Sequence, residues 1–469
     1  KAPLGAFFSG IIVSMLQNDK DTIVAIATAT GRGGVGVVRL SGKDLHVYIQ
    51  GMIGREILPR QASYCRFLDA AGEIIDQGVA LYFPAPHSFT GESVLELQGH
   101  GGMVILDALV QRCVSLGARV ARPGEFSERA FINDKMDLAQ AEAIADLIDA
   151  SSIEAAKSAV RSMQGDFSKL INQLVEEMIQ IRIYVEAAID FPEEEIDFLQ
   201  DEKLFSALDK LMQDITIVLE KAQQGSLLKD GLSLVLAGRP NAGKSSLLNS
   251  LAGNETAIVT PVAGTTRDVL REKIMLNGLP LNIVDTAGLR DTDNEIEAEG
   301  VRRAWREIEA ADQILFIVDS TQDHAPSLQS VWPEFFDRYP NSKQQLTLVL
   351  NKIDISGLSA GAVPGVQTAF AISAKEQTGF DSLVEHLQKS AGFLGHSEGL
   401  FSARRRHLVS LENALDLIVI GIAQLRNAGA GELLAEDLRQ AQKELSEITG
   451  QFTSDDLLGR IFSSFCIGK

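Results

Sequence analysis

The sequence predicts a multidomain protein of the α/β plus α class, in which one α/β domain is inserted into a discontinuous helical domain. A chain of 469 residues is too long for a single hydrophobic core, so about two to four domains are expected. Its pattern changes along the chain: β-rich runs broken by glycine fill residues 21–124, helical spacing fills 125–229 and 392–469, and alternating strands and helices fill 230–391.

The first domain, residues 21–124, contains short apolar runs typical of strands in an α/β domain. These runs are Ile23–Ala27, Val35–Leu40, Gly78–Phe83 and Val94–Leu97. Gly31–Gly36 also fits the G-x-G-x-x-G pattern of dinucleotide-binding proteins. The residues after it, Val37–Leu40, are strand-like where a dinucleotide fold requires a helix, so no dinucleotide site is expected there.

Two helical segments flank the inserted domain. Apolar residues recur at helical spacing first at Leu170, Leu174, Met178, Ile181 and Val185, and later in a heptad-like seam at Leu408, Leu411, Leu415, Ile418, Ile422 and Leu425. A proline and an acidic cluster in Asp190–Glu195 predict a connection between two helices. Since neither stripe has an evident partner in the segment between them, we predict one helical bundle domain made of 125–229 and 392–469.

The inserted segment, residues 230–391, alternates β-runs with helices, which predicts a mainly parallel sheet covered by helices. The expected strands are Leu232–Ala237, Leu281–Val284, Ile314–Val318, Leu346–Leu350 and Ala369–Ile372.

Charge and cysteine content narrow the function classes. A formal net charge of −20 argues against the broad basic surface of a nucleic-acid binder, so any RNA contact must be local or shared with a partner. The one dense basic run, Arg404–His407, fits either such a contact or a solvated helix start. The cysteines Cys65, Cys113 and Cys466 show no metal-like or CxxC spacing, which fits a reducing cytoplasm.

The first 20 residues are expected to lie outside the fold, as a leader of vector-derived or upstream sequence. The apolar stretch Ala6–Leu16 lacks the cleavage site of a signal peptide and is too short to span a bilayer. No other apolar run looks long enough for a membrane helix, so a soluble, cytoplasmic protein without membrane contact is expected.

A phosphate-binding loop follows the first strand of the inserted segment. Gly238-Arg-Pro-Asn-Ala-Gly-Lys-Ser245 fits G-x-x-x-x-G-K-[ST] and precedes the helix-forming residues Ser246–Leu251. In such a loop the backbone N–H groups wrap the phosphates, Lys244 reaches the β- and γ-phosphates, and the Ser245 hydroxyl binds Mg²⁺.

Further elements follow in chain order, each at the carboxyl end of an expected strand. Asp285-Thr-Ala-Gly288 supplies a carboxylate for the Mg²⁺ water shell and an N–H for the γ-phosphate. The carboxylate of Asn351-Lys-Ile-Asp354 can accept from guanine N1 and N2, which excludes adenine. Ser373-Ala-Lys375 supports the base through backbone contact. Together these elements predict a Ras-like P-loop GTPase domain that uses GTP and Mg²⁺.

The group that orients the hydrolytic water must differ from that of Ras-like switches, because Leu289 replaces their glutamine. The acidic residues in Asp291–Glu299 are candidates, and they also fit a solvated loop face. In Gly264–Asp268, Thr266 is the expected Mg²⁺ ligand from a switch loop. The side-chain oxygen of Asn241 can help to bind a monovalent cation, which would replace an arginine finger.

With these residues in hand, the chain closely resembles the MnmE/TrmE family of bacterial and organellar tRNA-modifying GTPases. The likeness runs from Asp21 to Lys469 and includes Gly31–Gly42, Ser88–Glu92, Arg122–Phe126, Asn241–Ser246, Gly264–Asp268, Asp285–Arg290 and Phe465–Lys469. The last segment is the most specific, since ribosome-assembly GTPases share the generic GTPase elements but not this tail.

The resemblance implies a homodimer joined through the N-terminal domain, whose GTPase domains meet when K⁺ and GTP are bound. It assigns K⁺ binding to Asn241, Thr260, Val262 and Thr265, and Mg²⁺ binding to Ser245 and Thr266. It also assigns orientation of the hydrolytic water to Glu297, beside Lys244 as a catalytic residue. The full expected nucleotide-binding set is Asn241, Ala242, Gly243, Lys244, Ser245, Ser246, Thr260, Pro261, Val262, Ala263, Gly264, Thr265, Thr266, Asp285, Thr286, Ala287, Gly288, Asn351, Lys352, Asp354, Ser373, Ala374 and Lys375.

The N-terminal domain is similar to folate-binding domains, and the resemblance implies contacts to 5-formyltetrahydrofolate or a related tetrahydrofolate from Arg39, Glu96, Lys135 and Lys469. With a flavoprotein partner of the MnmG/GidA family, which carries FAD, such proteins install a (carboxymethyl)aminomethyl-type group at C5 of the wobble uridine of certain tRNAs. The Cys466 thiol could be a nucleophile there, or could merely pack.

Two other function classes stay open at this stage. An assembly or signalling GTPase would act as a switch without modification chemistry, and the folate-like domain and the lack of a KH-type tail disfavour it. A scaffold with a dead nucleotide site conflicts with the intact Lys244, Ser245 and Asp285.

Overall fold

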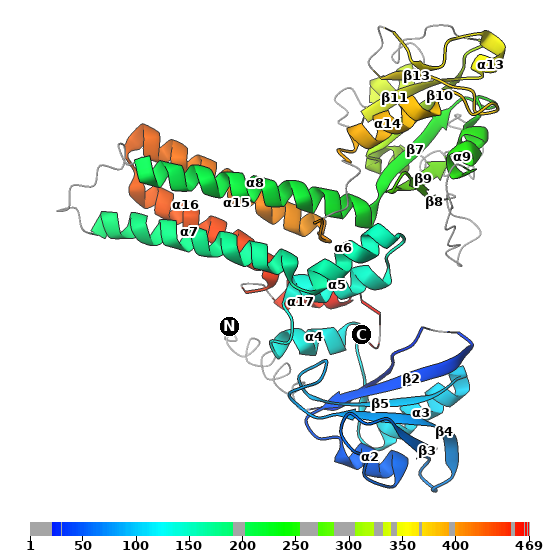
Figure 1. Ribbon diagram of the computed structural model, residues 1–469, viewed down its shortest axis with the longest axis vertical. Coiled ribbons are helices and arrows are strands. Elements are labelled where there is room, and N and C mark those ends of the chain that lie inside the picture. The colour runs from blue at the N-terminus through cyan, green and yellow to red at the C-terminus, as the bar shows by residue number, and fades with distance from the viewer. Residues whose placement is uncertain are drawn as a thin grey trace, which may run out of the picture. The chain divides into compact units, whose positions relative to one another are not determined.

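The computed structural model describes residues 21–29, 31–190, 202–253, 271–285, 305–322, 332–338, 345–364, 368–393, 399–451, 455–463, 465, 466 and 468 (Figure 1). They form two compact units: residues up to Ala145 together with those from Leu445 onward, and Asp146–Glu444. The expected leader, residues 1–20, lies outside the described residues. The predicted second helical segment, 392–469, contributes to both units, and the domain boundaries at 124, 229 and 391 remain predictions.

The first unit is built on a mixed sheet with the strand order β3-β4-β5-β2-β1-β6, in which only β1 and β6 pair in parallel. The elements are β1 (Ile23–Ile26), β2 (Gly33–Gly42), α2 (His46–Ile53), β3 (Ser63–Leu68), β4 (Ile74–Phe83), β5 (Ser93–Gly101), α3 (Met103–Ser115), β6 (Arg119–Val120), α4 (Glu125–Ile132) and α5 (Leu138–Ile148). The residues after Gly31–Gly36 form a strand, as the sequence predicted.

Helices α2 and α3 cover one face of this sheet. Alternate residues of the strands, such as Leu95 and Leu97, point toward these helices and are fully buried with Met52 and Leu109. The period of two along the strands and the amphipathic helices above them account for the core of the unit.

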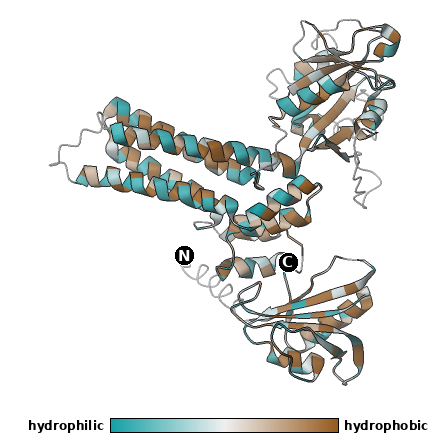
Figure 2. Cartoon of the chain, viewed as in Figure 1, coloured by the Kyte–Doolittle hydropathy of each residue, from teal (hydrophilic) through white to brown (hydrophobic). Residues whose placement is uncertain are grey.

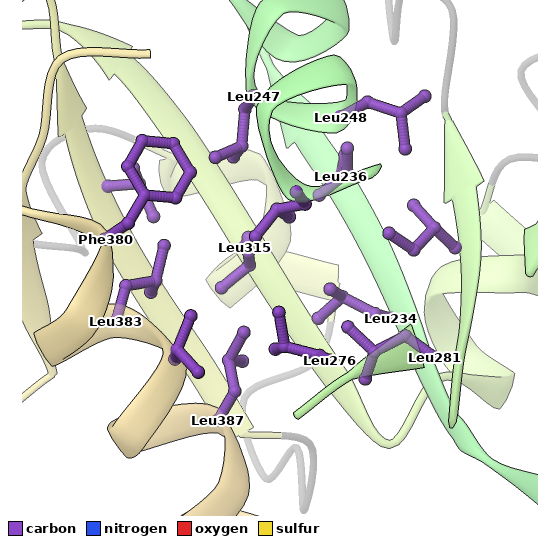
Figure 3. Close-up of a cluster of buried hydrophobic side chains, with 14 of the residues drawn as sticks. Leu234, Leu236, Leu247, Leu248, Leu276, Leu281, Leu315, Phe380, Leu383 and Leu387 are labelled. Carbon is purple, nitrogen blue, oxygen red and sulfur yellow. The ribbon is translucent and has the colours of Figure 1, made fainter. Parts of the chain in front are cut away.

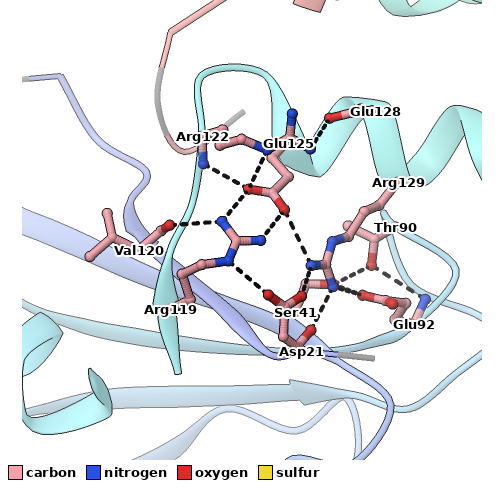
Figure 4. Close-up of polar contacts among 10 residues, drawn as sticks. All are labelled: Asp21, Ser41, Thr90, Glu92, Arg119, Val120, Arg122, Glu125, Glu128 and Arg129. Atoms are coloured by element: carbon pink, nitrogen blue, oxygen red, sulfur yellow. Dashed lines mark hydrogen bonds and ion pairs between the residues drawn. The ribbon is translucent and has the colours of Figure 1, made fainter. Parts of the chain in front are cut away.

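A network of charged side chains connects separate segments of the first unit (Figure 4). Arg119 donates two hydrogen bonds to the Glu125 carboxylate, at 3.1 and 2.6 Å, and a third from Nε to Asp21 Oδ2 at 2.7 Å. Arg129 bridges Asp21 Oδ1 at 2.7 Å and Glu92 Oε2 at 2.9 Å. The network therefore ties the start of β1, the turn before β5 and helix α4 together.

The pKa of Glu125 shows how this network is balanced. Burial by itself would raise the pKa, but hydrogen bonds from Arg119 and from the Arg122 N–H, with the charges of Arg119 and Arg129, outweigh burial and hold it below its usual value. Glu128 differs: burial raises its pKa, and its ion pair with Arg122 does not compensate. The fold thus stabilises the charged form of Glu125, whereas it does not stabilise that of Glu128.

The C-terminal residues pack inside the first unit. Helix α17 (Asp455–Ser463) and the segment after it place Phe462 and Phe465 in an apolar cluster with Leu138 and Ala141 of α5. Gly124 has a φ of +67°, and a Cβ there would lie 2.5 Å from the Phe462 oxygen, so only glycine allows this close approach.

The second unit contains antiparallel helices whose apolar stripes face one another (Figures 1 and 2). They are α6 (Ile153–Met163), α7 (Asp166–Asp190), α8 (Glu202–Asp230), α15 (Arg405–Ala428) and α16 (Gly431–Thr449), the last of which continues into the first unit. The predicted seams are observed: Met178 and Val185 of α7 are buried, as are Leu411 and Ile418 of α15. Helix α7 is described as far as Asp190, and the rest of the predicted interruption, residues 191–195, lies outside the described residues.

Asp146 joins the helices at the point where the chain leaves for the inserted domain and returns from it. Its carboxylate accepts hydrogen bonds from Arg404 Nη2 at 2.7 Å and from the Ser402 hydroxyl at 2.6 Å, and lies 3.7 Å from Lys229 Nζ. The side chain of Asp146 is only 5% exposed. This contact links residues that precede and follow the inserted domain.

Helix α15 requires one correction. The sequence was expected to hold no segment long and apolar enough to cross a membrane, yet α15 reaches that length and composition among the described helices. Core helices of soluble proteins meet the same criteria, and the face of α15 that carries Leu411, Ile418 and Leu425 is buried in the unit.

The inserted segment forms a seven-stranded sheet with the order β12-β13-β11-β10-β7-β9-β8. Its elements are β7 (Leu232–Gly238), α9 (Lys244–Gly253), β8 (Arg271–Leu276), β9 (Leu279–Asp285), β10 (Gln313–Asp319), α12 (Pro333–Arg338), β11 (Gln345–Asn351), α13 (Ile353–Ser356), β12 (Gly361–Ala362), β13 (Ala369–Ala371) and α14 (Phe380–Ser390). The five strands predicted here pair in parallel, and β8 and β12 add antiparallel edges.

Both faces of this sheet are buried. Leu234 and Leu236 point to one side, where they pack with Leu247 of α9 and with Leu383 of α14 (Figure 3). Val235 and Ala237 point to the other side, into a cluster that holds Trp305 and Trp332. A central parallel strand buried on both faces reads as a continuous apolar run, which is why Leu232–Ala237 was recognisable in the sequence.

We expect Glu125→Gln to loosen the first unit, because it removes the buried carboxylate that Arg119 and Arg129 share and leaves Asp21 and Glu92 as their remaining charged partners. Removing one partner of a buried ion network typically costs about 3 kcal/mol, which corresponds to roughly a hundredfold faster amide exchange in β1 and α4. Hydrogen exchange read by mass spectrometry checks this. Since the pKa of folded Glu125 lies below its unfolded value, its contribution is present at neutral pH and lost as the pH falls below about 4.5.

The matched control is Glu128→Gln. Burial raises the pKa of Glu128, so its charge is held at a cost, and this variant should exchange no faster than the wild-type chain at neutral pH. Equal exchange in the two variants, or a Glu125→Gln effect that grows in acid, would contradict this account of the network.

Candidate functional site

The phosphate-binding loop between β7 and α9 has a backbone that its glycines make possible. Gly243 has a φ of +97°, and a Cβ there would lie 2.1 Å from Asn351 Nδ2. Gly238 has a φ of +146°, and a Cβ there would lie 2.3 Å from the Ile317 oxygen of the neighbouring strand β10. Asn241 is a non-glycine residue with a positive φ, at 63°. The loop is therefore held in a conformation that turns sharply into the start of α9.

Lys244 opens α9 and bends back over the loop. Its Nζ donates to the Gly238 oxygen at 2.8 Å and to the Arg239 oxygen at 3.3 Å. Ser245 and Ser246 follow in the first turn of α9 and are exposed. The structure thus brings an ammonium group and a hydroxyl to the N-terminal end of one helix, which is the arrangement that binds phosphate and its counter-ion.

Asn351 joins this loop to two others at the carboxyl edge of the sheet. Its Nδ2 donates to the Ala242 oxygen at 2.9 Å, and its Oδ1 accepts from the N–H groups of Lys352 at 2.8 Å and Ala374 at 3.0 Å. The residue is 2% exposed. All of these side-chain groups are satisfied by backbone, so Asn351 fixes the relative position of the three loops.

Asp354 is exposed, and its carboxylate is oriented from one side. The buried Ser373 donates from its hydroxyl to Asp354 Oδ1 at 2.7 Å, and accepts from the Glu376 N–H at 3.1 Å. The next residue, Ala374, receives at its backbone oxygen a hydrogen bond of 2.7 Å from Ser250 of α9. A carboxylate fixed at one oxygen and open to solvent can accept a paired set of N–H groups from a ligand.

Several expected nucleotide contacts lie outside the described residues. They are Thr260, Pro261, Val262, Ala263, Gly264, Thr265, Thr266, Thr286, Ala287, Gly288 and Glu297. Asp285 is described as the last residue of β9, which is the position the sequence predicted, but its side chain is not described. Lys375 is exposed beside Glu376, 3.5 Å away.

In the first unit, the structure brings together Arg39 and Glu96 from the expected folate set. They face each other across β2 and β5, with Arg39 Nη2 at 2.9 Å from Glu96 Oε1. The guanidinium also lies 5.7 Å from the ring centre of Phe89 and 5.9 Å from that of Phe126. The sequence did not single out these aromatic residues as ligand contacts, although both belong to motifs that carried the family resemblance.

The remaining expected folate and catalytic residues are less closely associated. Lys135 is exposed and has its side chain near Gly91, with no described contact to Arg39 or Glu96. Lys469 lies outside the described residues. Cys466 is an exposed free cysteine whose backbone oxygen accepts from the Gly124 N–H at 3.3 Å, whereas Cys65 and Cys113 are buried.

The basic run Arg404–His407 is partly structural. Arg404 pairs with the buried Asp146, and the His407 ring, 2% exposed, accepts from the Arg404 N–H at 3.0 Å and lies against Phe167. These two residues therefore do not form an exposed basic surface, and Arg405 is the exposed residue of the run. The described residues contain no group of three or more metal-ligating side chains.

Comparison with known proteins gives consistent matches over nearly the whole chain. Residues 22–135 match the model of the GTP-binding protein TrmE N-terminus, and residues 138–466 match the MnmE helical domain. The tRNA modification GTPase MnmE of Pectobacterium carotovorum is 59% identical over 97% of this chain and 100% of its own length. The protein of the same name from Pseudomonas savastanoi is 58% identical over 96% of this chain and 99% of its own length.

Solved structures with similarity to part of this chain include Era in complex with MgGDPNP and a part of 16S ribosomal RNA. That structure is 26% identical, covers 40% of this chain and 66% of the other, and has a TM-score of 0.27. The G domain of the T. maritima FeoB iron transporter is 20% identical, covers 34% of this chain and 98% of the other, and has a TM-score of 0.26.

We expect Asn351→Ala to destabilise the inserted domain, because the substitution leaves the Ala242 oxygen and two backbone N–H groups without their partner. Each such group costs about 1–3 kcal/mol, so a loss of about 3 kcal/mol is expected. The two tryptophans of the chain, Trp305 and Trp332, both lie in this domain, and urea unfolding followed by tryptophan fluorescence therefore reports on it. Asn249→Ala, an exposed change on α9, is the control and should leave the midpoint unchanged.

We expect one cysteine per chain to react rapidly with a thiol reagent in the native protein. Cys466 is exposed, whereas burial raises the pKa of Cys113 to about 12 and disfavours its thiolate. Cys466→Ser should abolish the fast phase, and urea should expose the two buried thiols. A fast phase that survives in Cys466→Ser would show that a buried cysteine is reactive.

Proposed function

The chain belongs to the MnmE/TrmE family, and on that premise we propose that it is a GTPase that takes part in the modification of tRNA. The observation that carries the proposal is the identity of 59% with a tRNA modification GTPase over that protein's full length. The geometry agrees with it, because one buried asparagine holds a phosphate-binding loop beside an exposed carboxylate that suits guanine.

In the proposed reaction, Lys244 and the loop N–H groups bind the β- and γ-phosphates. The Lys244 ammonium lies over the loop, where it donates to two of the loop's carbonyl oxygens, and it could donate to phosphate oxygens bound in the same loop. Ser245 supplies a hydroxyl oxygen at the same helix start, and with Thr266 and the water shell at Asp285 it forms an oxygen donor set that fits Mg²⁺. When bound there, Mg²⁺ would neutralise the negative charge that develops between the β- and γ-phosphates.

Base selection is proposed to rest on Asp354. Ser373 fixes one oxygen of this carboxylate, and the exposed side can accept from guanine N1 and N2. Adenine lacks that donor pair and would leave the carboxylate unpaired. Loss of such hydrogen bonds discriminates between ligands more strongly than a difference in apolar contact does. Asn351, Lys352, Ala374 and Lys375 complete the proposed guanine subsite.

For hydrolysis we propose that Glu297 orients the attacking water and that K⁺ replaces the positive charge of an arginine finger. The exposed Asn241 offers a side-chain oxygen to K⁺ at the edge of the loop, and the remaining proposed ligands are Thr260, Val262 and Thr265. These oxygen donors fit an alkali cation, which would supply fixed positive charge near the transferred phosphoryl group.

In the first unit we propose a tetrahydrofolate site around Arg39 and Glu96, with Lys135 and Lys469 as further contacts. The Arg39–Glu96 pair offers both a cation and a carboxylate, and the half-buried Phe89 adds an aromatic ring, which together suit a flat heterocycle bearing carboxylates. The tetrahydrofolate would supply the one-carbon unit. Cys466 is an exposed thiol of the same unit and a candidate nucleophile.

The proposed assembly is a homodimer that works with an MnmG/GidA-type FAD protein on the wobble uridine of tRNA. Family membership over almost the full chain favours this function over an assembly or signalling GTPase without modification chemistry. Deletion of the gene followed by mass spectrometry of tRNA nucleosides distinguishes the two, because only the proposed function predicts loss of the wobble-uridine modification.

We expect single-turnover GTP hydrolysis to be at least roughly tenfold faster in K⁺ than in Na⁺, because a cation of the right size contributes several kcal/mol to charge stabilisation. Lys244→Ala should reduce the rate by about 10²–10³-fold in K⁺, as loss of one preorganised donor does. Lys389→Ala removes an exposed lysine at the end of α14 and is the charge-matched control.

These outcomes separate the two parts of the proposal. Equal slow rates in K⁺ and Na⁺ would contradict the cation-dependent mechanism while leaving the GTPase assignment in place. Turnover that Lys244→Ala does not reduce would contradict the GTPase assignment itself.

A further inference from the structure

Asp319 is the last residue of β10, directly beside the guanine-binding edge of the sheet. It pairs in register with Asn351, the last residue of β11. Its Oδ2 accepts a hydrogen bond of 2.6 Å from Lys352 Nζ, and this ion pair is only part-exposed, at 15% for the aspartate side chain and 30% for the lysine. Asp319 belongs to none of the nucleotide-binding motifs in the sequence.

The carboxylate of Asp319 is itself held in place. Its Oδ1 accepts from the Thr321 N–H at 3.0 Å and from the Thr321 hydroxyl at 2.6 Å. The hydrogen bond from Lys352, followed by those from Thr321, keeps the pKa of Asp319 below its usual value despite partial burial. One oxygen therefore anchors the aspartate to its own turn, and the other faces Lys352.

Lys352 is consequently fixed at both ends. Its backbone follows the buried Asn351 in a left-handed conformation, with a φ of 69°, and its N–H donates to Asn351 Oδ1. Its ammonium is bound to Asp319. A lysine stem with free ends samples many rotamers, and a ligand that packs on the stem must restrict them, whereas a stem fixed at both ends is already ordered.

We propose that Asp319 is a positioning residue for the guanine subsite: it orders the aliphatic stem of Lys352 so that a guanine base can pack on it, and it raises nucleotide affinity without contacting the nucleotide. This inference rests on the proposed GTP-binding function.

The test is a titration of the full-length protein with mant-GDP and with mant-GTP. Asp319→Ala should raise the Kd for both nucleotides by the same factor, about five- to tenfold, because the ordering of one long side chain must then accompany binding. The kcat at saturating GTP should stay within about twofold and the KM should rise with the Kd, because nothing at the γ-phosphate changes.

A double-mutant cycle with Lys352→Ala gives the decisive measurement. Once the lysine stem is absent, Asp319→Ala should change the Kd by less than about twofold, so that the two substitutions are strongly non-additive. Asp381→Ala is the control, since it removes an exposed carboxylate of the same domain at the start of α14 and should leave the Kd unchanged.

Asp319→Asn guards against a folding defect, because it keeps an oxygen for the Thr321 hydrogen bonds while it removes the charge facing Lys352. Its urea midpoint, read by tryptophan fluorescence, should match wild type while its Kd rises. Unchanged Kd values in both Asp319 variants, or additive effects in the cycle, would overturn the inference. Failure of the wild-type protein to bind mant-GDP would instead overturn the proposed function.

Discussion

The hydrogen bonds of the Asn351 side chain are the interaction on which the candidate nucleotide site depends. The buried amide of Asn351 forms hydrogen bonds with Ala242 of the phosphate-binding loop, with Lys352 directly after β11, and with Ala374 in the loop after β13. An amide suits this place because it donates and accepts at once, whereas an ionised carboxylate only accepts and would leave the Ala242 oxygen unpaired. The sheet fixes where the loops begin, and Asn351 fixes how they meet.

Other residues of that edge orient functional groups in the same way. Ser373 holds one oxygen of Asp354, and Asp319 holds the ammonium of Lys352. In both cases a side chain that ends one strand or loop fixes a side chain from another. The proposed guanine subsite is thus formed before any ligand arrives, which lowers the ordering entropy that binding must overcome.

The first unit shows that residues in a family motif need not be ligand contacts. Glu92 belongs to the segment Ser88–Glu92, and Glu125 belongs to Arg122–Phe126. Both carboxylates bind Arg129, and Glu125 also binds Arg119. These ion pairs link α4 to β6 and to the residue before β5. Phe89 and Phe126 of the same motifs lie beside Arg39. Each of the two motifs therefore contributes a carboxylate to the ion network and an aromatic ring beside Arg39.

The local elements were predictable from the sequence because they depend on short-range spacing. The apolar run Leu232–Ala237 with the following glycine-rich loop predicted β7, the loop and α9, and the helical stripe through Met178 and Val185 predicted α7. By contrast, β3 and the helices α2 and α3 were not predicted, since their apolar patterns are short and only the sheet that they complete makes them distinct.

The sequence by itself determined which chemical groups this protein can present: a phosphate-loop motif, the carboxylate proposed to select guanine, and the cysteine Cys466, each set by residue types at fixed short spacing. Only the tertiary structure decided which of them meet. Asn351 reaches Ala242, and Asp319 reaches Lys352, because parallel strands distant in the chain end at one edge of a sheet. Strand order is set by packing of the whole core, and no local pattern records it.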